Sequence, residues 1–108
     1  MALGAPRAAI NETGLSQSTL GLIRGVFKRH PNVTAVILFG SRAKGTASPA
    51  SDVDLALEGH LDALQVEAIR SELDELTLPY RFDVVGLELV RLDSLREHIE
   101  RVGVRIYG

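Results

Sequence analysis

The passage VILFGSRAKGTASPASDVDLAL, residues 36–57, constrains the fold more than any other part of the chain. It begins inside an apolar, β-branched run, Val33–Phe39, which is typical of a central strand covered on both faces. Gly40 and Ser41 end this run. The chain after them can turn into a short helix, whose free N–H groups and positive dipole end suit a phosphate. The passage therefore predicts a buried strand that carries a phosphate-binding turn at its end.

Two carboxylates follow this turn. Ten residues separate Ser41 from Asp52, and Asp52 and Asp54 flank Val53 in a segment that alternates polar and apolar residues. If this segment, Asp52–Glu58, is a strand, both carboxylates leave the same face. Neighbouring carboxylates repel each other unless a cation lies between them, and a hard divalent ion such as Mg²⁺ prefers carboxylate and phosphate oxygens. We therefore expect a site for a metal and a triphosphate.

A third acid stands in an apolar segment further along the chain. Asp83 is the single acid in RFDVVGL, which predicts a third strand, and a carboxylate buried there needs a partner. Before this segment, residues 61–76 place apolar residues at helical spacing, with acidic residues on a solvated face. The order strand, helix, strand indicates a crossover between neighbouring strands, which would bring Asp83 beside Asp52 and Asp54.

Two further helices and an N-terminal leader complete the expected elements. Ser16 suits the N-cap of a helix that runs to about His30. Asp93 or Ser94 can cap a last helix. The apolar stripe of this last helix would consist of Leu95, Ile99, Val102 and Ile106. Residues 1–15 mix Gly, Pro, Ala and Asn without a period and indicate a poorly ordered leader, so the expected domain covers residues 16–108.

Composition excludes several classes of protein. The chain has 108 residues, of which 45% are hydrophobic and 24% charged, and this balance is typical of one small globular domain. A formal net charge of −2 does not favour direct binding of nucleic acid. The absence of cysteine excludes disulfides and thiolate metal sites. Because the chain has neither an apolar segment of membrane-spanning length nor a signal peptide, we expect a cytoplasmic protein with no membrane partner.

The motif GSRAKGTASPASDVDL resembles the signature of the nucleotidyltransferase superfamily that includes DNA polymerase beta. In that superfamily a glycine-serine pair is followed at this spacing by D-x-D. The chain's length and its LPYRFDVVGL segment are most similar to the minimal nucleotidyltransferases, small proteins encoded beside a HEPN-domain partner. The resemblance extends from about Leu20 to Tyr107. It implies an α/β (α+β) nucleotidyltransferase fold, in which a small mixed β-sheet of three or more strands is flanked by about four helices.

The resemblance also implies a reaction, the Mg²⁺-dependent transfer of AMP from ATP by a two-metal mechanism, in which Mn²⁺ can replace Mg²⁺. Asp52 and Asp54 would bind both ions. Asp83 would complete the ion on the side of the attacking hydroxyl and help to activate that hydroxyl. The triphosphate would be bound through backbone amides, a hydroxyl and basic side chains, which come from Gly40, Ser41, Arg42 and Lys44.

We expect the grip on the acceptor to come from elsewhere, most economically from a separate partner chain, because the expected catalytic unit uses nearly all the residues. The resemblance implies a HEPN-family helical toxin as the partner in a hetero-oligomer, with AMP transferred to one of its tyrosines and this chain acting as the antitoxin. Two alternatives remain open. The acceptor could be a small molecule such as an aminoglycoside, bound together with a partner subunit, or the chain could be a non-catalytic, nucleotide-binding antitoxin module.

Overall fold

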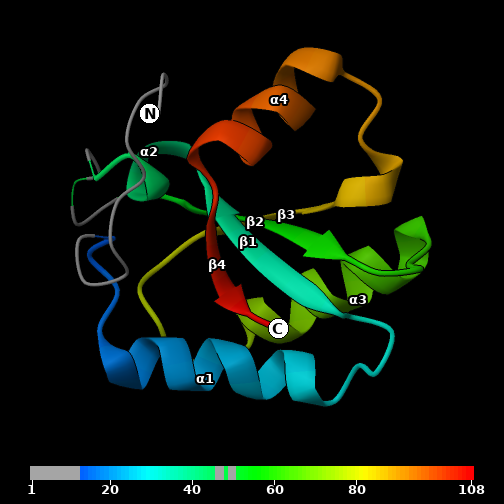
Figure 1. Ribbon diagram of the computed structural model, residues 1–108. Coiled ribbons are helices and arrows are strands. Elements are labelled where there is room, and N and C mark those ends of the chain that lie inside the picture. The colour runs from blue at the N-terminus through cyan, green and yellow to red at the C-terminus, as the bar shows by residue number, and fades with distance from the viewer. Residues whose placement is uncertain (1–12, 46–47, 49–50) are drawn as a thin grey trace.

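Four strands form one mixed sheet in the computed structural model, which describes residues 13–45, 48 and 51–108 (Figure 1). The strands are β1 (Ala35–Phe39), β2 (Val53–Glu58), β3 (Phe82–Gly86) and β4 (Val104–Tyr107). Their order in the sheet is β3-β2-β1-β4. Strand β1 is antiparallel to β2 and to β4, whereas β2 and β3 run parallel. The predicted central position of β1 and the predicted pairing of the second and third strands are both confirmed.

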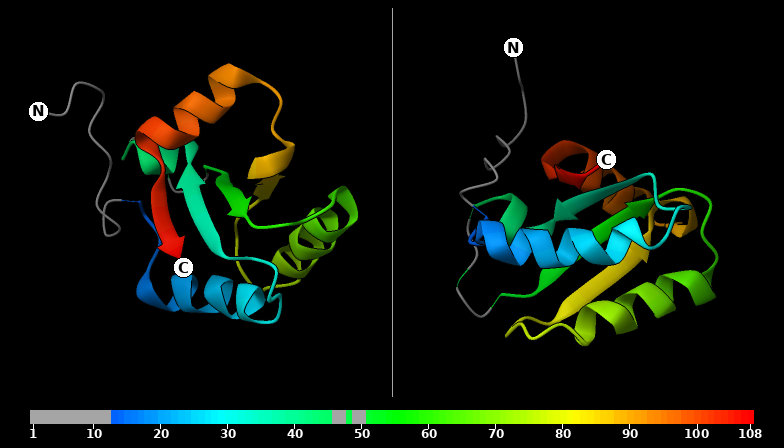
Figure 2. Two further views of the ribbon diagram at one scale, coloured as in Figure 1. Left: turned by 45° about the vertical axis from the view of Figure 1, so that its right-hand side comes forward. Right: turned by 90° about the horizontal axis from the view of Figure 1, so that it is seen from below.

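Helices cover both faces of this sheet (Figures 1 and 2). The α-helices of the described residues are α1 (Gln17–Lys28), α2 (Gly40–Ala43), α3 (Ala63–Asp74) and α4 (Asp93–Val102), and a short 3₁₀ helix, η2, spans Leu87–Leu89. Helices α1 and α3 lie on one face, and α4 lies on the other. Helix α2 follows β1 directly at one end of the sheet. This arrangement agrees with the expected mixed sheet and its flanking helices.

The alternation of side chains along β1 explains why this strand is apolar throughout. Val36 and Leu38 join the core that β1 shares with α1 and α3. Ile37 and Phe39 point to the opposite face, where they pack with the Ile99 side chain of α4. Because successive residues of a strand face opposite sides, a strand covered on both faces needs apolar residues at every position.

The N-termini of α1 and α3 are fixed by side-chain caps. Ser16 Oγ accepts a hydrogen bond from the Thr19 N–H, as expected from its position before the apolar stripe of α1. Asp62 and Gln65 form a capping box at the start of α3, in which each side chain accepts a hydrogen bond from the other's backbone N–H. Local sequence therefore determines where both helices begin.

The C-terminal region differs from the prediction. Neither Asp93 nor Ser94 is the N-cap of α4, because the helix begins one residue earlier than expected, after Leu92. The helix ends at Val102, with Gly103 as its C-cap, and Ile106 lies in β4 instead of the predicted helical stripe. Gly103 has an extended backbone conformation, and a Cβ atom there would overlap the Ile37 side chain. Because glycine has no side chain, the backbone can pass close to Ile37 as it leaves α4 and enters β4.

Part of the expected leader belongs to the packed domain. Residues 1–12 lie outside the described part, but Thr13 and Leu15 are buried. The exposed connection expected between the first two strands, residues 46–51, is described only at Ser48 and Ser51. Across the ranges that the structure describes, no helix has the length and apolar character needed to cross a membrane.

We expect Glu72→Gln to destabilise the protein at neutral pH. Glu72, on α3, accepts a hydrogen bond from Arg29 at 2.9 Å and is paired with His30, so it ties the end of α1 to α3. Partial burial raises the pKa of the Glu72 carboxyl, but the hydrogen bonds from Arg29 and His30 outweigh this effect and lower the pKa below its usual value. The ionised form is therefore stabilised on folding. This contribution is present above the unfolded-state pKa and is lost as the pH falls through the lowered folded-state pKa.

Thermal melts at two pH values test this prediction. The melting temperature should fall by roughly 2–5 °C at pH 7, and the difference from the unmodified protein should vanish near about pH 3. Glu75→Gln is a suitable control, since Glu75 is an exposed residue at the end of the same helix. An equal loss of stability for both variants, or a loss at low pH, would contradict the ion-pair explanation.

Candidate active site at one edge of the sheet

Three chain segments meet at one edge of the sheet. Strand β1 ends where the antiparallel β2 begins, so Phe39 pairs with Asp54. Strand β3 runs parallel to β2, so Asp83 pairs with the same Asp54. Gly40 directly follows Phe39 and lies at this edge as well. The structure thus brings together the glycine turn and two of the predicted acids, and the predicted neighbourhood of Asp54 and Asp83 is confirmed.

Gly40 and Asp54 are in direct contact. A Cβ atom at Gly40 would overlap Oδ2 of Asp54, and the φ angle of Gly40 is +75°. Both observations require glycine, because an L-residue disfavours positive φ and because the carboxylate occupies the space of a side chain. The turn at Gly40 and the Asp54 carboxylate therefore pack against each other, although they belong to different elements.

The carboxylates at this edge repel each other. Partial burial raises the pKa of Asp54, and the negative charges of Asp83 and Asp52 raise it further. The positive charge of Arg42 acts in the opposite direction and does not cancel the rise. Asp52 is exposed and directly precedes β2. A divalent cation between these oxygens would relieve the repulsion and favour the ionised form.

These residues fit a hard metal ion bound jointly with a ligand. Carboxylate oxygens are the donors that Mg²⁺ prefers. Within residues 13–45, 48 and 51–108, however, no three His, Cys, Asp or Glu side chains cluster tightly enough to hold an ion by themselves. Mg²⁺ usually binds through one or two carboxylates and completes its shell with water and substrate phosphates. Asp52, Asp54 and Asp83 thus suit an ion that arrives with a triphosphate.

Helix α2 begins at this edge, with Gly40 against the Asp54 carboxylate. In the described structure its N-cap residue, Phe39, makes no side-chain cap hydrogen bond. Ser41 is half-buried in this turn, and Lys44 is exposed at the other end of the helix. Backbone N–H groups at a helix start are suited to an anionic group such as a phosphate.

Arg42 lies elsewhere than the sequence predicts. We expected its guanidinium to contact phosphate, but the side chain is only 1% exposed. Its two terminal nitrogens each donate a hydrogen bond of 2.9 Å, Nη1 to the Thr13 carbonyl and Nη2 to the Ser51 carbonyl. The guanidinium carbon also lies 4.7 Å from the centre of the Tyr80 ring. The side chain turns into the protein because these acceptors and the ring enclose it, so direct phosphate contact is replaced by internal contacts.

The sequence contains no signal for two of the residues that the structure places here. Thr13 and Tyr80 contact Arg42 only because distant segments meet in the fold.

His98, on α4, packs edge-on against Phe39, with 6.3 Å between the ring centres. Burial lowers the pKa of His98, and the charges of Lys44 and Arg101 lower it further, which favours the neutral imidazole.

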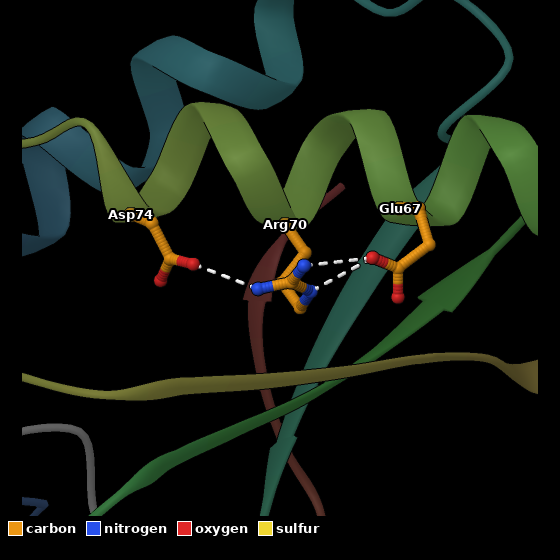
Figure 3. Close-up of polar contacts among 3 residues, drawn as sticks. All are labelled: Glu67, Arg70 and Asp74. Carbon is orange, nitrogen blue, oxygen red and sulfur yellow. Dashed lines mark hydrogen bonds and ion pairs between the residues drawn. The ribbon is translucent and has the colours of Figure 1, made fainter.

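The outer face of α3 is solvated, as predicted, and its charges are paired (Figure 3). Arg70 donates hydrogen bonds of 2.8 and 3.0 Å to Glu67 and one of 2.8 Å to Asp74. The hydrogen bond from Arg70 lowers the pKa of Glu67. The Arg70 guanidinium also interacts electrostatically with Asp83, although its hydrogen bonds in the described structure go to residues of its own helix. Arg70 is thus a cation close enough to Asp83 to interact with it, but its hydrogen bonds are made to Glu67 and Asp74.

A cavity of about 510 Å³ lies at the other end of β2 from Asp54. Glu58 and Glu88 line it, and both would repel a triphosphate. Arg96 also lines the cavity, and its guanidinium donates hydrogen bonds to the carbonyls of Leu87 and Val90 at 2.9 and 2.7 Å. Asp52, Asp54 and Asp83 do not line this cavity.

Known proteins share this arrangement of elements. Residues 22–108 match the family model described as polymerase beta, nucleotidyltransferase. Over 94 residues the chain is 32% identical to the Haemophilus influenzae protein named probable protein adenylyltransferase MntA, and this match covers 85% of the chain and 82% of the relative.

Two solved structures show the same fold at low sequence identity. A chain in a toxin–antitoxin complex with AMP-PNP has a TM-score of 0.70 and 24% identity, with 82% of this chain and 73% of that chain covered. A chain in the complex of a tri-AMPylated Shewanella oneidensis HEPN toxin with an MNT antitoxin has a TM-score of 0.59 and 21% identity, with 82% and 72% covered. The predicted nucleotidyltransferase fold is confirmed.

Proposed function

Because the chain belongs to the polymerase beta nucleotidyltransferase family, we propose that it is an adenylyltransferase that transfers AMP from ATP to a hydroxyl group of a partner protein. The observation that carries this proposal is the contact between Gly40 and Asp54 at the edge that Asp54 shares with Asp83. It places the turn that we propose for phosphate binding against carboxylates whose mutual repulsion a cation would relieve. The curated relative, named as a protein adenylyltransferase, supports AMP as the transferred group.

Each residue at the edge has a role in this reaction. Backbone N–H groups at Gly40 and Ser41 would bind the β- and γ-phosphates, and Lys44 would add a positive charge beside them. Asp52 and Asp54 would hold Mg²⁺ together with the phosphate oxygens. When bound, Mg²⁺ supplies positive charge that stabilises the transition state and the leaving pyrophosphate. Asp83, next to Asp54, would orient the acceptor hydroxyl and favour the loss of its proton.

The bond changes in this reaction are simple. The acceptor oxygen bonds to the α-phosphorus of ATP, and the bond from that phosphorus to the oxygen that bridges to the β-phosphate breaks. Pyrophosphate leaves with this bridging oxygen, and the acceptor keeps an AMP group in place of its proton. The enzyme contributes position and charge, since phosphoryl-type transfers require little covalent chemistry from the protein.

The acceptor in this proposal is a tyrosine of a HEPN-family helical protein that forms a hetero-oligomer with this chain. A structural neighbour that contains an AMPylated HEPN toxin and an MNT antitoxin supports this choice. Modification of the toxin would make the chain an antitoxin. The catalytic domain would comprise residues 16–108 together with the packed segment from Thr13.

Transfer of label from ATP tests the proposal. The purified chain is incubated with Mg²⁺, ATP labelled on the α-phosphate, and a lysate of its host, and the products are separated on a denaturing gel. We expect one labelled protein band with the intact chain and a loss of at least about 100-fold in labelling with Asp52→Asn. Label on a small molecule would replace the protein acceptor by a metabolite or drug. If ATP binds but no acceptor is labelled, the chain is a nucleotide-binding module and the proposed enzyme is rejected.

A further inference from the structure

We propose that Arg42 is a positioning residue that fixes the carboxylates relative to the phosphate turn without touching the nucleotide. The link to catalysis depends on the function proposed above, but the structural role of Arg42 can be tested separately. Arg42 is among the largest side chains that are fully buried in the described structure. A buried guanidinium is costly unless its N–H groups are satisfied and its charge is compensated, so its place indicates a specific role.

The guanidinium joins segments that lead to each part of the site. Arg42 directly follows Ser41 of the phosphate turn. Its Nη2 donates to the Ser51 carbonyl, and Ser51 immediately precedes Asp52. Its face packs on Tyr80, which lies three residues before Asp83. A shift of this one group would therefore move the turn, the first two acids and the third acid relative to one another.

Further hydrogen bonds fix the positions of the segments around Ser51 and Tyr80 relative to each other. Ser51 Oγ accepts a hydrogen bond of 2.9 Å from the Ser48 N–H, and the Ser51 N–H donates to the Ser48 carbonyl at 3.0 Å. The Val53 N–H donates to the Arg81 carbonyl at 2.9 Å, which ties the start of β2 to the segment after Tyr80. Because these hydrogen bonds connect the segments, a displacement of Arg42 should also displace Asp52 and Asp54.

The N-terminal segment closes over the guanidinium. Nη1 of Arg42 donates to the Thr13 carbonyl, and a Cβ atom at Gly14 would lie 2.8 Å from that nitrogen. Gly14 also has a positive φ of +80°. Its lack of a side chain therefore allows the segment to cover Arg42, and Gly14→Ala should displace the guanidinium while leaving Arg42 itself unchanged.

Lysine cannot replace arginine in this place. The two carbonyl acceptors belong to different segments, and the planar fork of arginine reaches both while its face stacks on the Tyr80 ring. A lysine ammonium presents a single point of charge and cannot stack in this way. We therefore expect Arg42→Lys and Arg42→Gln to have similar defects. A residue that acted only through its positive charge would be rescued by lysine.

Kinetic constants distinguish positioning from phosphate binding. We expect Arg42→Lys to lower kcat by about 100-fold, because an error of about 1 Å in alignment has an effect of this size. The KM for ATP should stay within about threefold, since the Arg42 guanidinium is buried and donates to internal carbonyls. Lys44→Ala should show the opposite pattern, mainly a higher KM. A raised KM with unchanged kcat for Arg42→Lys would overturn the proposal.

Hydrogen exchange of the metal-free protein provides a second readout that does not depend on activity. In Arg42→Lys and in Gly14→Ala, we expect amides of residues 51–54 to exchange at least about tenfold faster, while the core of α3 keeps its protection. Gly21→Ala is the matched control, since a Cβ atom there meets no described atom within 4 Å. Unchanged exchange at residues 51–54 would reject the role of Arg42.

The two proposals can fail separately. If the intact chain labels no acceptor but residues 51–54 lose protection in the Arg42 variants, the proposed enzymatic function fails and the structural role of Arg42 stands. If exchange rises uniformly over the whole chain, Arg42 is a general stabilising residue and the positioning role is rejected. If labelling occurs and Arg42→Lys has a normal kcat, the enzyme stands and the positioning role is rejected.

Discussion

Asp54→Asn is expected to abolish AMP transfer and, at the same time, to raise the melting temperature of the metal-free protein. Partial burial and the charges of Asp83 and Asp52 raise the pKa of Asp54, so its ionised form is less favourable in the folded state than in the unfolded state. Asparagine has the same shape but carries no charge. It removes the repulsion together with the proposed metal ligand.

The pH dependence follows from the direction of this shift. Because the folded-state pKa of Asp54 is raised, the folded protein binds more protons than the unfolded chain between the two pKa values. Stability therefore falls as the pH rises through this window and stays lower above it. Asp54→Asn should raise the melting temperature by roughly 2–5 °C at pH 7 and have little effect below the unfolded-state pKa.

Melting curves recorded in EDTA measure the change in stability. The labelling assay with Mg²⁺ measures the loss of AMP transfer. AMP transfer should fall by at least about 1,000-fold, the scale expected when charge stabilisation of the transition state is removed. Asp74→Asn is the control, because Asp74 lies on the exposed face of α3 and pairs with Arg70. It should not raise stability or reduce transfer. Lower stability of metal-free Asp54→Asn at pH 7 would show that the carboxylates do not repel each other as described.

Gly40→Ala is expected to damage both the fold and the site. The φ angle of +75° is unfavourable for alanine, and its Cβ atom would collide with Oδ2 of Asp54. Relief of this collision requires a shift of the Asp54 carboxylate or of the phosphate turn. We expect the free energy of unfolding to fall by about 1–3 kcal/mol and AMP transfer to fall by at least about 100-fold.

Urea denaturation and the labelling assay test this variant against Gly25→Ala. Gly25 lies in α1, and a Cβ atom there has no described neighbour within 4 Å. Alanine at this helical position should stabilise the protein by about 0.5–1 kcal/mol and leave transfer unchanged. Near-normal transfer by Gly40→Ala would mean that the turn and the carboxylate need not touch during the reaction.

The elements of the site could be predicted because their signals are local. A strand buried on both faces needs continuous apolar residues, and β1 has them. Asp83 was expected beside Asp54 because a strand, a helix and a second strand in succession favour parallel neighbours. The prediction was wrong where a local pattern suits two structures. Ile106 continues the stripe of α4, yet it lies in β4.

The sequence by itself determined the order of the elements as far as β3, the turn at Gly40 and the acids at Asp54 and Asp83, because helix and strand periods and glycine conformation act over a few residues. Only the tertiary structure decided the place of Arg42. Its hydrogen bond to the Thr13 carbonyl spans 29 residues, and a backbone carbonyl leaves no trace in the side-chain pattern. From the sequence, a charged residue beside the Gly40 turn suggests a contact with a ligand. In the fold, two backbone carbonyls and the Tyr80 ring surround the Arg42 guanidinium instead.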